Sequence, residues 1–152
     1  MALSNFLRRV LRRLFGALRG RSPDLVIPQH TTLSRFIFST RHFSKTSPKP
    51  PAFLPRETDL RISASWIDKL LESEIWQIGD GAGRARQKLA CARADFQKSI
   101  VDEVRLTIEQ DPVPDNSRHV NISGWPSEKD RRMSIAQDLC AKSMLRIRQE
   151  AD

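Results

Sequence analysis

The chain has 152 residues, 39% of them hydrophobic, and a formal net charge of +8 at pH 7. This length supports a single domain with one core. The two cysteines, Cys91 and Cys140, are expected to be reduced thiols, because their spacing fits neither a disulfide scaffold nor a metal site. No stretch reaches the roughly 20 apolar residues that a membrane-spanning helix needs, and no cofactor is predicted.

The positive charge is concentrated at the N-terminal end. Residues 1–50 contain 10 Lys/Arg and one acid, whereas residues 51–152 contain 16 Lys/Arg and 17 acids. A high net charge is typical of proteins that bind nucleic acid or anionic surfaces. Here that inference applies to an N-terminal arm and not to the remainder of the chain.

Residues 1–21 are predicted to form an amphipathic helical arm. Apolar residues recur at spacings of three and four, and the opposite half of the helical wheel carries arginines: Arg8, Arg9, Arg12, Arg13 and Arg19. Contact with an anionic membrane surface or nucleic acid, a cleavable mitochondrial presequence, docking on its own domain, and translation from an upstream start all remain open. The expected location is cytoplasmic, peripheral to a membrane if the arm binds lipid, and mitochondrial if the arm is a presequence. The sequence identifies no protein partner.

Residues 22–32 are predicted to be a linker, and residues 33–152 a compact domain. Alternating apolar and polar residues predict strands over residues 33–39 and 60–66. The proline-rich stretch between them cannot be a helix or a central strand. We expect it to be an extended surface loop that Phe53 and Leu54 anchor.

A helix is predicted over residues 72–91, although three glycines within residues 79–83 weaken it. This glycine cluster has some likeness to a phosphate-binding loop but lacks the Gly-Lys-Ser/Thr sequence, so a broken helix is favoured. Residues 92–96 are predicted to be a short strand or turn. Residues 104–109 alternate as a strand does, and the prolines that follow predict a loop.

The C-terminal part is predicted to be one long helix over residues 128–149, with Ser127 as N-cap and Asp130 completing a capping box. Trp125, in a Gly-Trp-Pro turn before it, is expected to be buried. Strands with interspersed helices, too few for regular βαβ repeats, indicate the α+β class. The expected architecture is a single domain with a mixed or antiparallel sheet, a long C-terminal helix and a peripheral N-terminal helix.

Chemistry, if present, is expected from polar groups in loops. His42, His119 and Arg93 are the candidate catalytic residues, because two imidazoles can transfer protons near pH 7 and an arginine can hold a phosphate. Supporting binding residues are proposed to be Arg35, Ser44, Arg118 and Asn121. Each histidine also has a structural interpretation, as a cap or a solvated side chain, that remains open.

Two resemblances bear on these residues. His42-Phe43-Ser44-Lys45 and His119-Val120-Asn121-Ile122 are similar to the paired motifs of two-histidine phosphoesterases, and each departs at one position. The chain more closely resembles a family of short uncharacterised bacterial proteins found in mobile or horizontally acquired DNA. This resemblance spans residues 33–145, includes Arg118-His119-Val120-Asn121-Ile122 and Gly124-Trp125-Pro126, and departs at 62–66.

The family resemblance implies a bacterial cytoplasmic protein and brings no known activity with it. The favoured hypothesis is an α+β protein whose basic arm contacts an acidic partner or surface. The alternative is a His/Arg-dependent enzyme or binding module that acts on a phosphate-bearing substrate, either a nucleotide or a nucleic acid. Whether the chain is an enzyme stays open at this point.

Overall fold

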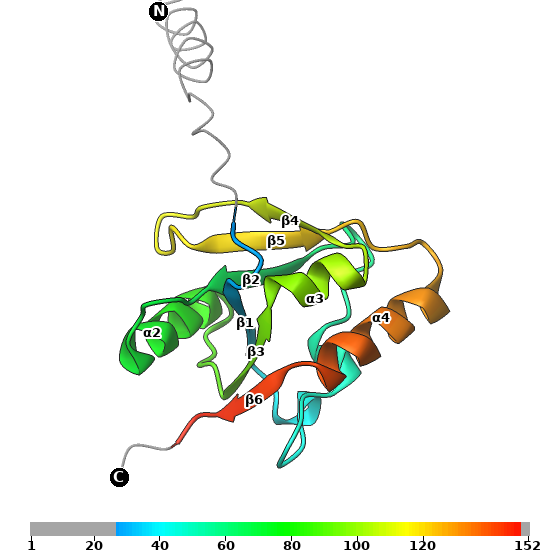
Figure 1. The fold of residues 1–152 in the computed structure, drawn as a ribbon. Coiled ribbons are helices and arrows are strands. Elements are labelled where there is room, and N and C mark those ends of the chain that lie inside the picture. The colour runs from blue at the N-terminus through cyan, green and yellow to red at the C-terminus, as the bar shows by residue number, and fades with distance from the viewer. Residues whose placement is uncertain (1–26, 150–152) are drawn as a thin grey trace, which may run out of the picture.

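The computed structural model describes residues 27–149 (Figure 1). The predicted N-terminal arm, with its arginines, lies outside the described residues. Ile27 and Thr31 are already buried against the domain, so packing begins within the predicted linker.

The fold is α+β, as predicted, and its centre is a six-stranded antiparallel sheet with the order β4-β5-β2-β1-β3-β6. The strands are β1 (Thr32–Ile37), β2 (Ile62–Trp66), β3 (Ala92–Gln97), β4 (Thr107–Gln110), β5 (His119–Ser123) and β6 (Met144–Ile147). The α-helices are α2 (Glu72–Gly83), α3 (Lys98–Glu103) and α4 (Lys129–Ala141). Short 3₁₀ turns are η1 (Thr40–His42), η2 (Pro50–Ala52) and η3 (Arg84–Arg86). Within residues 27–149, no helix has the length and apolarity to cross a bilayer.

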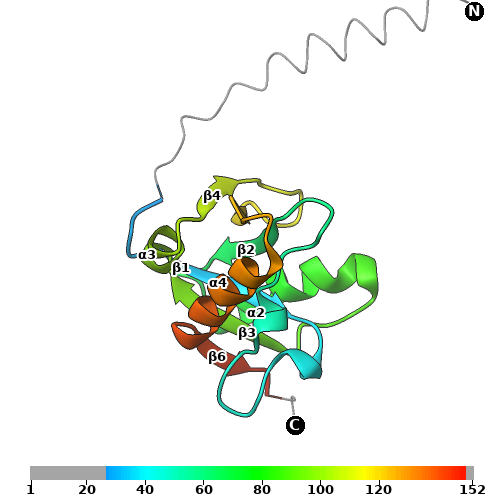
Figure 2. The same ribbon diagram turned by 90° about the vertical axis from the view of Figure 1, so that its right-hand side faces the viewer.

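Helices cover both faces of the sheet. Figures 1 and 2 show α2 on one side and α4 on the other. Because side chains alternate along a strand, Leu33 and Ile37 of β1 face α4, whereas Phe36 faces α2. The main core therefore lies between the sheet and α4, and a smaller one lies under α2.

The main core explains the proline-rich loop. Phe53, just after η2, is fully buried, and its ring meets that of Phe96 edge-on with centroids 5.5 Å apart. Leu54 packs partly buried against the same cluster. The predicted anchoring of this loop is therefore confirmed.

The smaller core explains the glycines of α2. A Cβ at Gly79 would lie 2.5 Å from the Phe36 ring, and one at Gly83 would lie 2.0 Å from the Lys88 carbonyl oxygen. These glycines permit close packing of α2, rather than forming a phosphate-binding loop. The helix ends at Gly83, earlier than the predicted residue 91, because the chain must turn there to enter β3.

The predicted C-terminal helix is wrong in its second half. Helix α4 ends at Ala141, and residues 144–147 form β6 on the edge of β3. The free edge of β3 offers backbone partners to this stretch, and such tertiary pairing outweighs an apolar spacing of three and four. Ser127 is not the N-cap: Glu128 occupies that position, and no side chain caps the helix.

The strand predicted over residues 104–109 begins later than expected. Residues 98–103 form α3, Val104 is its C-cap, and Arg105 adopts a left-handed conformation with φ 59°. The apolar alternation at Val104, Leu106 and Ile108 therefore spans a helix end, a turn and a strand. Residues 92–96, predicted as a strand or turn, belong to β3, which lies between β1 and β6.

One junction in the sheet is short. Strand β1 pairs with β3 over six residue pairs but with β2 over only two, Leu33 with Trp66 and Ser34 with Ser65. A further backbone bond joins the Ile67 N–H to the Thr32 carbonyl at 3.0 Å. Beyond Ser34 the two strands no longer pair, and this opening positions the candidate site.

Candidate functional site

A cavity of about 110 Å³ lies where β1 and β2 part. Its walls come from β1, β2, the end of α2, η3 and the segment that leads into β5. The lining residues are Arg35, Phe36, Phe38, Ser63, Ala64, Ser65, Ala82, Arg86, Asn116 and His119. Of the residues predicted from the sequence, the structure brings Arg35 and His119 to this cavity.

Arg35 occupies the opening between the strands. Its Nε donates to the Ala52 carbonyl at 3.0 Å, and one terminal nitrogen donates to the Ser63 carbonyl at 2.9 Å. Within residues 27–149 no carboxylate forms an ion pair with it. Burial, followed by the nearby charges of Arg86 and Arg56, lowers the pKa of this guanidinium to about 10. Arg35 is therefore a protonated cation at pH 7 that the described protein does not neutralise.

A second cation stands at the cavity mouth. Arg86 is exposed, and its guanidinium lies 5.9 Å from the centroid of the Phe38 ring. No aspartate or glutamate is among the described residues that line the cavity. The lining is therefore electropositive, and an anion is the ligand that it favours.

His119 and Ser65 supply an imidazole and a hydroxyl group. The Nδ1 atom of His119 lies 2.7 Å from the Asp111 carbonyl oxygen, which can only accept. Nδ1 therefore carries a hydrogen, and Nε2 is left available. The Asn116 amide donates to the Ser65 hydroxyl at 2.8 Å, so both residues are held in place at the cavity wall.

Arg118 and Asn121 flank the site without lining it. Arg118 donates to the Asp68 carbonyl at 3.0 Å and lies over the Trp66 ring, 5.3 Å from its centroid. The Asn121 amide donates to an Asp111 carboxylate oxygen at 2.7 Å. Both side chains thus have structural partners around the start and middle of β5.

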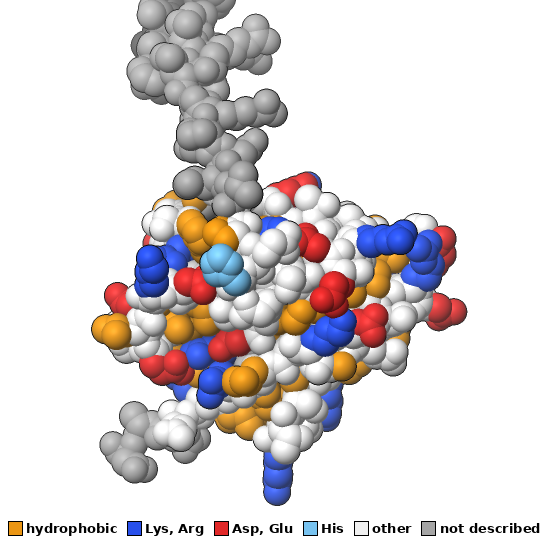
Figure 3. Space-filling model, viewed as in Figure 1, with side chains coloured by type: hydrophobic (Ala, Val, Ile, Leu, Met, Phe, Trp, Pro, Cys, Tyr) orange, Lys and Arg blue, Asp and Glu red, His pale blue; other side chains and the backbone are white. Residues whose placement is uncertain are grey.

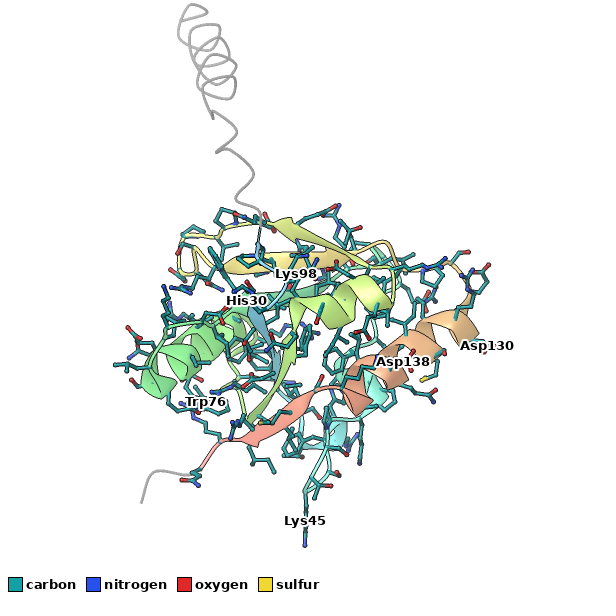
Figure 4. All side chains as sticks on the ribbon, viewed as in Figure 1. His30, Lys45, Trp76, Lys98, Asp130 and Asp138 are labelled. Carbon is teal, nitrogen blue, oxygen red and sulfur yellow. The ribbon has the colours of Figure 1, made fainter. Side chains whose placement is uncertain are left out.

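Arg93 lies elsewhere, in a buried cluster between α2 and β3. Its guanidinium is paired with Glu72 at 2.8 Å and Asp95 at 3.1 Å, and lies 5.0 Å from the Trp76 ring centroid. Figure 4 shows Trp76 beside β6. Because two carboxylates already hold this arginine, it is not free to bind a phosphate in the predicted way.

His42 and Ser44 are also absent from the cavity lining. His42 ends η1, and its carbonyl accepts from the Lys49 N–H, whereas Ser44 bonds within its own tight turn to Ser47. Lys45, at the tip of this loop, points away from the domain at the end opposite β5 (Figure 4). The structure therefore does not bring the two histidines to one cavity.

Four polar cavity residues were missed from the sequence: Ser63, Ser65, Arg86 and Asn116. The two serines could have been found from the strand alternation, since they form the polar face of β2. Arg86 and Asn116 lie in a 3₁₀ turn and a loop, where no periodicity indicates the direction of a side chain. These two side chains reach the cavity only because the folded chain brings the turn and the loop together.

Other hollows of the described surface have acidic side chains in their lining, including Glu72 and Asp80 beside α2 and Asp95 beside β6. On the face in Figure 3, acidic and basic side chains are interspersed. No group of three or more His, Cys, Asp or Glu residues in the described part of the chain could hold a metal ion. Comparisons with family models, curated proteins and solved structures return no match. The family resemblance inferred from the sequence therefore stays a prediction.

Proposed function

We propose that the protein binds a small phosphate-bearing ligand in the cavity of Arg35, Arg86 and His119. The observation that carries this proposal is a partly buried guanidinium with only carbonyl partners in a cavity whose described lining contains no carboxylate. Removing a cation from water is unfavourable unless a counter-charge offsets it. A bound anion supplies that charge, and the remaining N–H groups of Arg35 can donate to it.

The size of the cavity favours a single phosphate group. At about 30 Å³ for each water molecule, its volume of about 110 Å³ corresponds to three or four waters. This space suits one phosphoryl group, with the rest of the ligand outside. Arg86 at the mouth would donate to the phosphoryl group, and Phe38 would contact the outer part of the ligand. Nucleotides and other phosphate esters share the required chemistry.

The first test compares two neighbouring arginines of η3. Arg86 lines the cavity, whereas Arg84 is exposed and pairs with Asp115 at 3.4 Å. We expect Arg86→Gln to weaken binding of inorganic phosphate about tenfold, the loss of a charged hydrogen bond worth about 1.4 kcal/mol. Arg84→Gln removes the same charge and should change the Kd less than twofold. Isothermal titration and amide chemical shifts measure both.

Equal weakening by Arg86→Gln and Arg84→Gln would show general charge attraction and contradict a built site. Absence of binding at millimolar phosphate would also overturn the proposal. Shifts confined to amides of β1, β2 and the start of β5 would support it. Thermal unfolding of each variant without phosphate provides the stability control.

We also propose that the arginine-rich arm of a cytoplasmic protein contacts an anionic surface. The support is the charge distribution, since residues 1–50 hold 10 basic residues and one acid. Changing Arg8, Arg9, Arg12 and Arg13 to glutamine should abolish most binding to phosphatidylserine vesicles, because each basic residue near such a surface contributes about 1 kcal/mol. Vesicle co-sedimentation at low and high salt measures this.

The matched control removes four charges from the domain instead: Arg41, Lys45, Lys69 and Lys88. These side chains are exposed and belong to none of the ion pairs among residues 27–149. Equal loss of vesicle binding in both variants would contradict a specific role of the arm. A duplex oligonucleotide in place of vesicles separates a lipid surface from nucleic acid.

A further inference from the structure

Three side chains stand in a row across the α2 face of the sheet: Asp111, His119 and Ser65. Ser65 of β2 is directly opposite His119 of β5, and the Asp111 N–H donates to the His119 carbonyl at 3.1 Å. Directly opposed residues have Cβ atoms about 4.5–5.5 Å apart on one face. The row therefore places a carboxylate, an imidazole and a hydroxyl in that order, although their sequence order is different.

Hydrogen bonds fix the orientation of His119 and Ser65, both of which line the cavity. Asp111 holds the Nδ1 side of His119 through its carbonyl at 2.7 Å and its carboxylate at 3.5 Å, so Nε2 of the neutral ring is an acceptor. Asn116 donates to Ser65, which leaves the hydroxyl hydrogen of Ser65 free to be donated. No hydrogen bond joins Ser65 to His119 here, and such catalytic bonds commonly tighten only when substrate is bound.

We propose that Ser65 is a nucleophile for phosphoryl transfer, with His119 as its general base and Asp111 as the residue that positions the imidazole. This proposal rests on phosphate binding in the same cavity. Ser65 Oγ forms a bond to phosphorus while the bond from phosphorus to the leaving oxygen breaks. The Ser65 proton moves to His119 Nε2, and Arg35 offsets the charge on the non-bridging oxygens.

The second half of the reaction restores the protein. The imidazolium releases its proton to solvent through the open mouth. Water then attacks the phosphoserine, His119 takes a proton from that water, and the imidazolium passes this proton to Ser65 Oγ as the bond to phosphorus breaks and inorganic phosphate is released. At the end of the cycle Ser65 is again a hydroxyl and His119 has no added proton. Water is the only co-reactant. Activated donors whose leaving group needs no proton, such as acyl phosphates, are the favoured substrate class.

Acetyl phosphate is the probe, because acetate leaves without protonation and the donor is small. We expect phosphate on Ser65 by peptide mass spectrometry, or Ser65-dependent release of inorganic phosphate if hydrolysis is fast. Ser65→Ala should abolish both, and His119→Gln should slow transfer about 100-fold or more. Asp111→Asn should lower the rate and shift its pH profile. Ser123→Ala is the control, since Ser123 lies on the same face outside the cavity and bonds to Glu109.

Each outcome decides between the two proposals. Phosphate binding without Ser65-dependent transfer or release would overturn the nucleophile and leave the binding function standing. Transfer to Ser63, or a rate that His119→Gln does not change, would also overturn it. A protein that binds no phosphate would overturn both. Retained phosphate binding in Ser65→Ala shows that loss of transfer does not reflect unfolding.

Discussion

Trp125→Ala is expected to reduce the free energy of unfolding by about 3–5 kcal/mol, the range for truncating a large buried aromatic side chain. The indole is 6% exposed and packs in the main core, and its Nε1 donates to the Ile122 carbonyl at 3.1 Å. The variant loses apolar burial, leaves a cavity and removes the hydrogen bond from the indole to that carbonyl. Urea denaturation followed by circular dichroism measures the change.

Two further variants separate these contributions. Trp125→Phe keeps a ring and removes the N–H donor, so it should cost less than Trp125→Ala. Met133→Ala, on the 38% exposed side chain of α4, should change stability by less than about 0.5 kcal/mol. A loss at Trp125 no larger than at Met133 would contradict the packing of the indole.

Arg93→Met should cost about 3 kcal/mol, because removal of one partner leaves a buried charge without compensation. The side chain of Glu72 is 63% exposed and can be solvated, whereas that of Asp95 is 13% exposed. The cost therefore falls mainly on Asp95, whose pKa is raised by burial despite the opposing charge of Arg93. Urea denaturation at several pH values measures it.

The sign of the pH effect follows from that carboxyl. Without Arg93 the folded-state pKa of Asp95 rises further, so the folded variant keeps a proton that the unfolded chain releases above about pH 4. Stability of Arg93→Met should fall as pH rises from there toward neutrality, and the deficit relative to the parent should be smallest in acid. Arg93→Met with Asp95→Asn should recover part of the loss and remove the pH dependence. A pH-independent deficit would contradict this account.

The strands were the most predictable part of the fold. In β2, Ile62, Ala64 and Trp66 form one face and two serines form the other, so the period of two appears directly in the sequence. The same approach failed at the C-terminus, where Met144 and Ile147 also fit a helical stripe. These residues form a strand because β3 has an edge with unpaired backbone groups beside them. That edge exists only in the folded chain, so the local sequence does not show it.

The candidate site was less predictable, for a related reason. Arg35 and His119 were selected from the sequence as polar groups beside confident elements, and both line the cavity. His42 and Arg93 had equally suitable chemistry, yet their placement depends on partners far along the chain, such as Glu72 for Arg93. Chemical type is visible in a sequence, whereas the absence of a neutralising neighbour is visible only in the fold.

The short β1–β2 ladder has a thermodynamic consequence. It divides the sheet into two three-stranded halves, β4-β5-β2 and β1-β3-β6, each joined internally by ladders of at least four pairs. The cavity takes Arg35 and Phe36 from one half and Ser65 and His119 from the other. A bound ligand would therefore link the two halves. Its binding would raise the free energy of unfolding, and the halves would unfold together. Amides along β2 would then exchange more slowly with solvent deuterium as the ligand concentration rises.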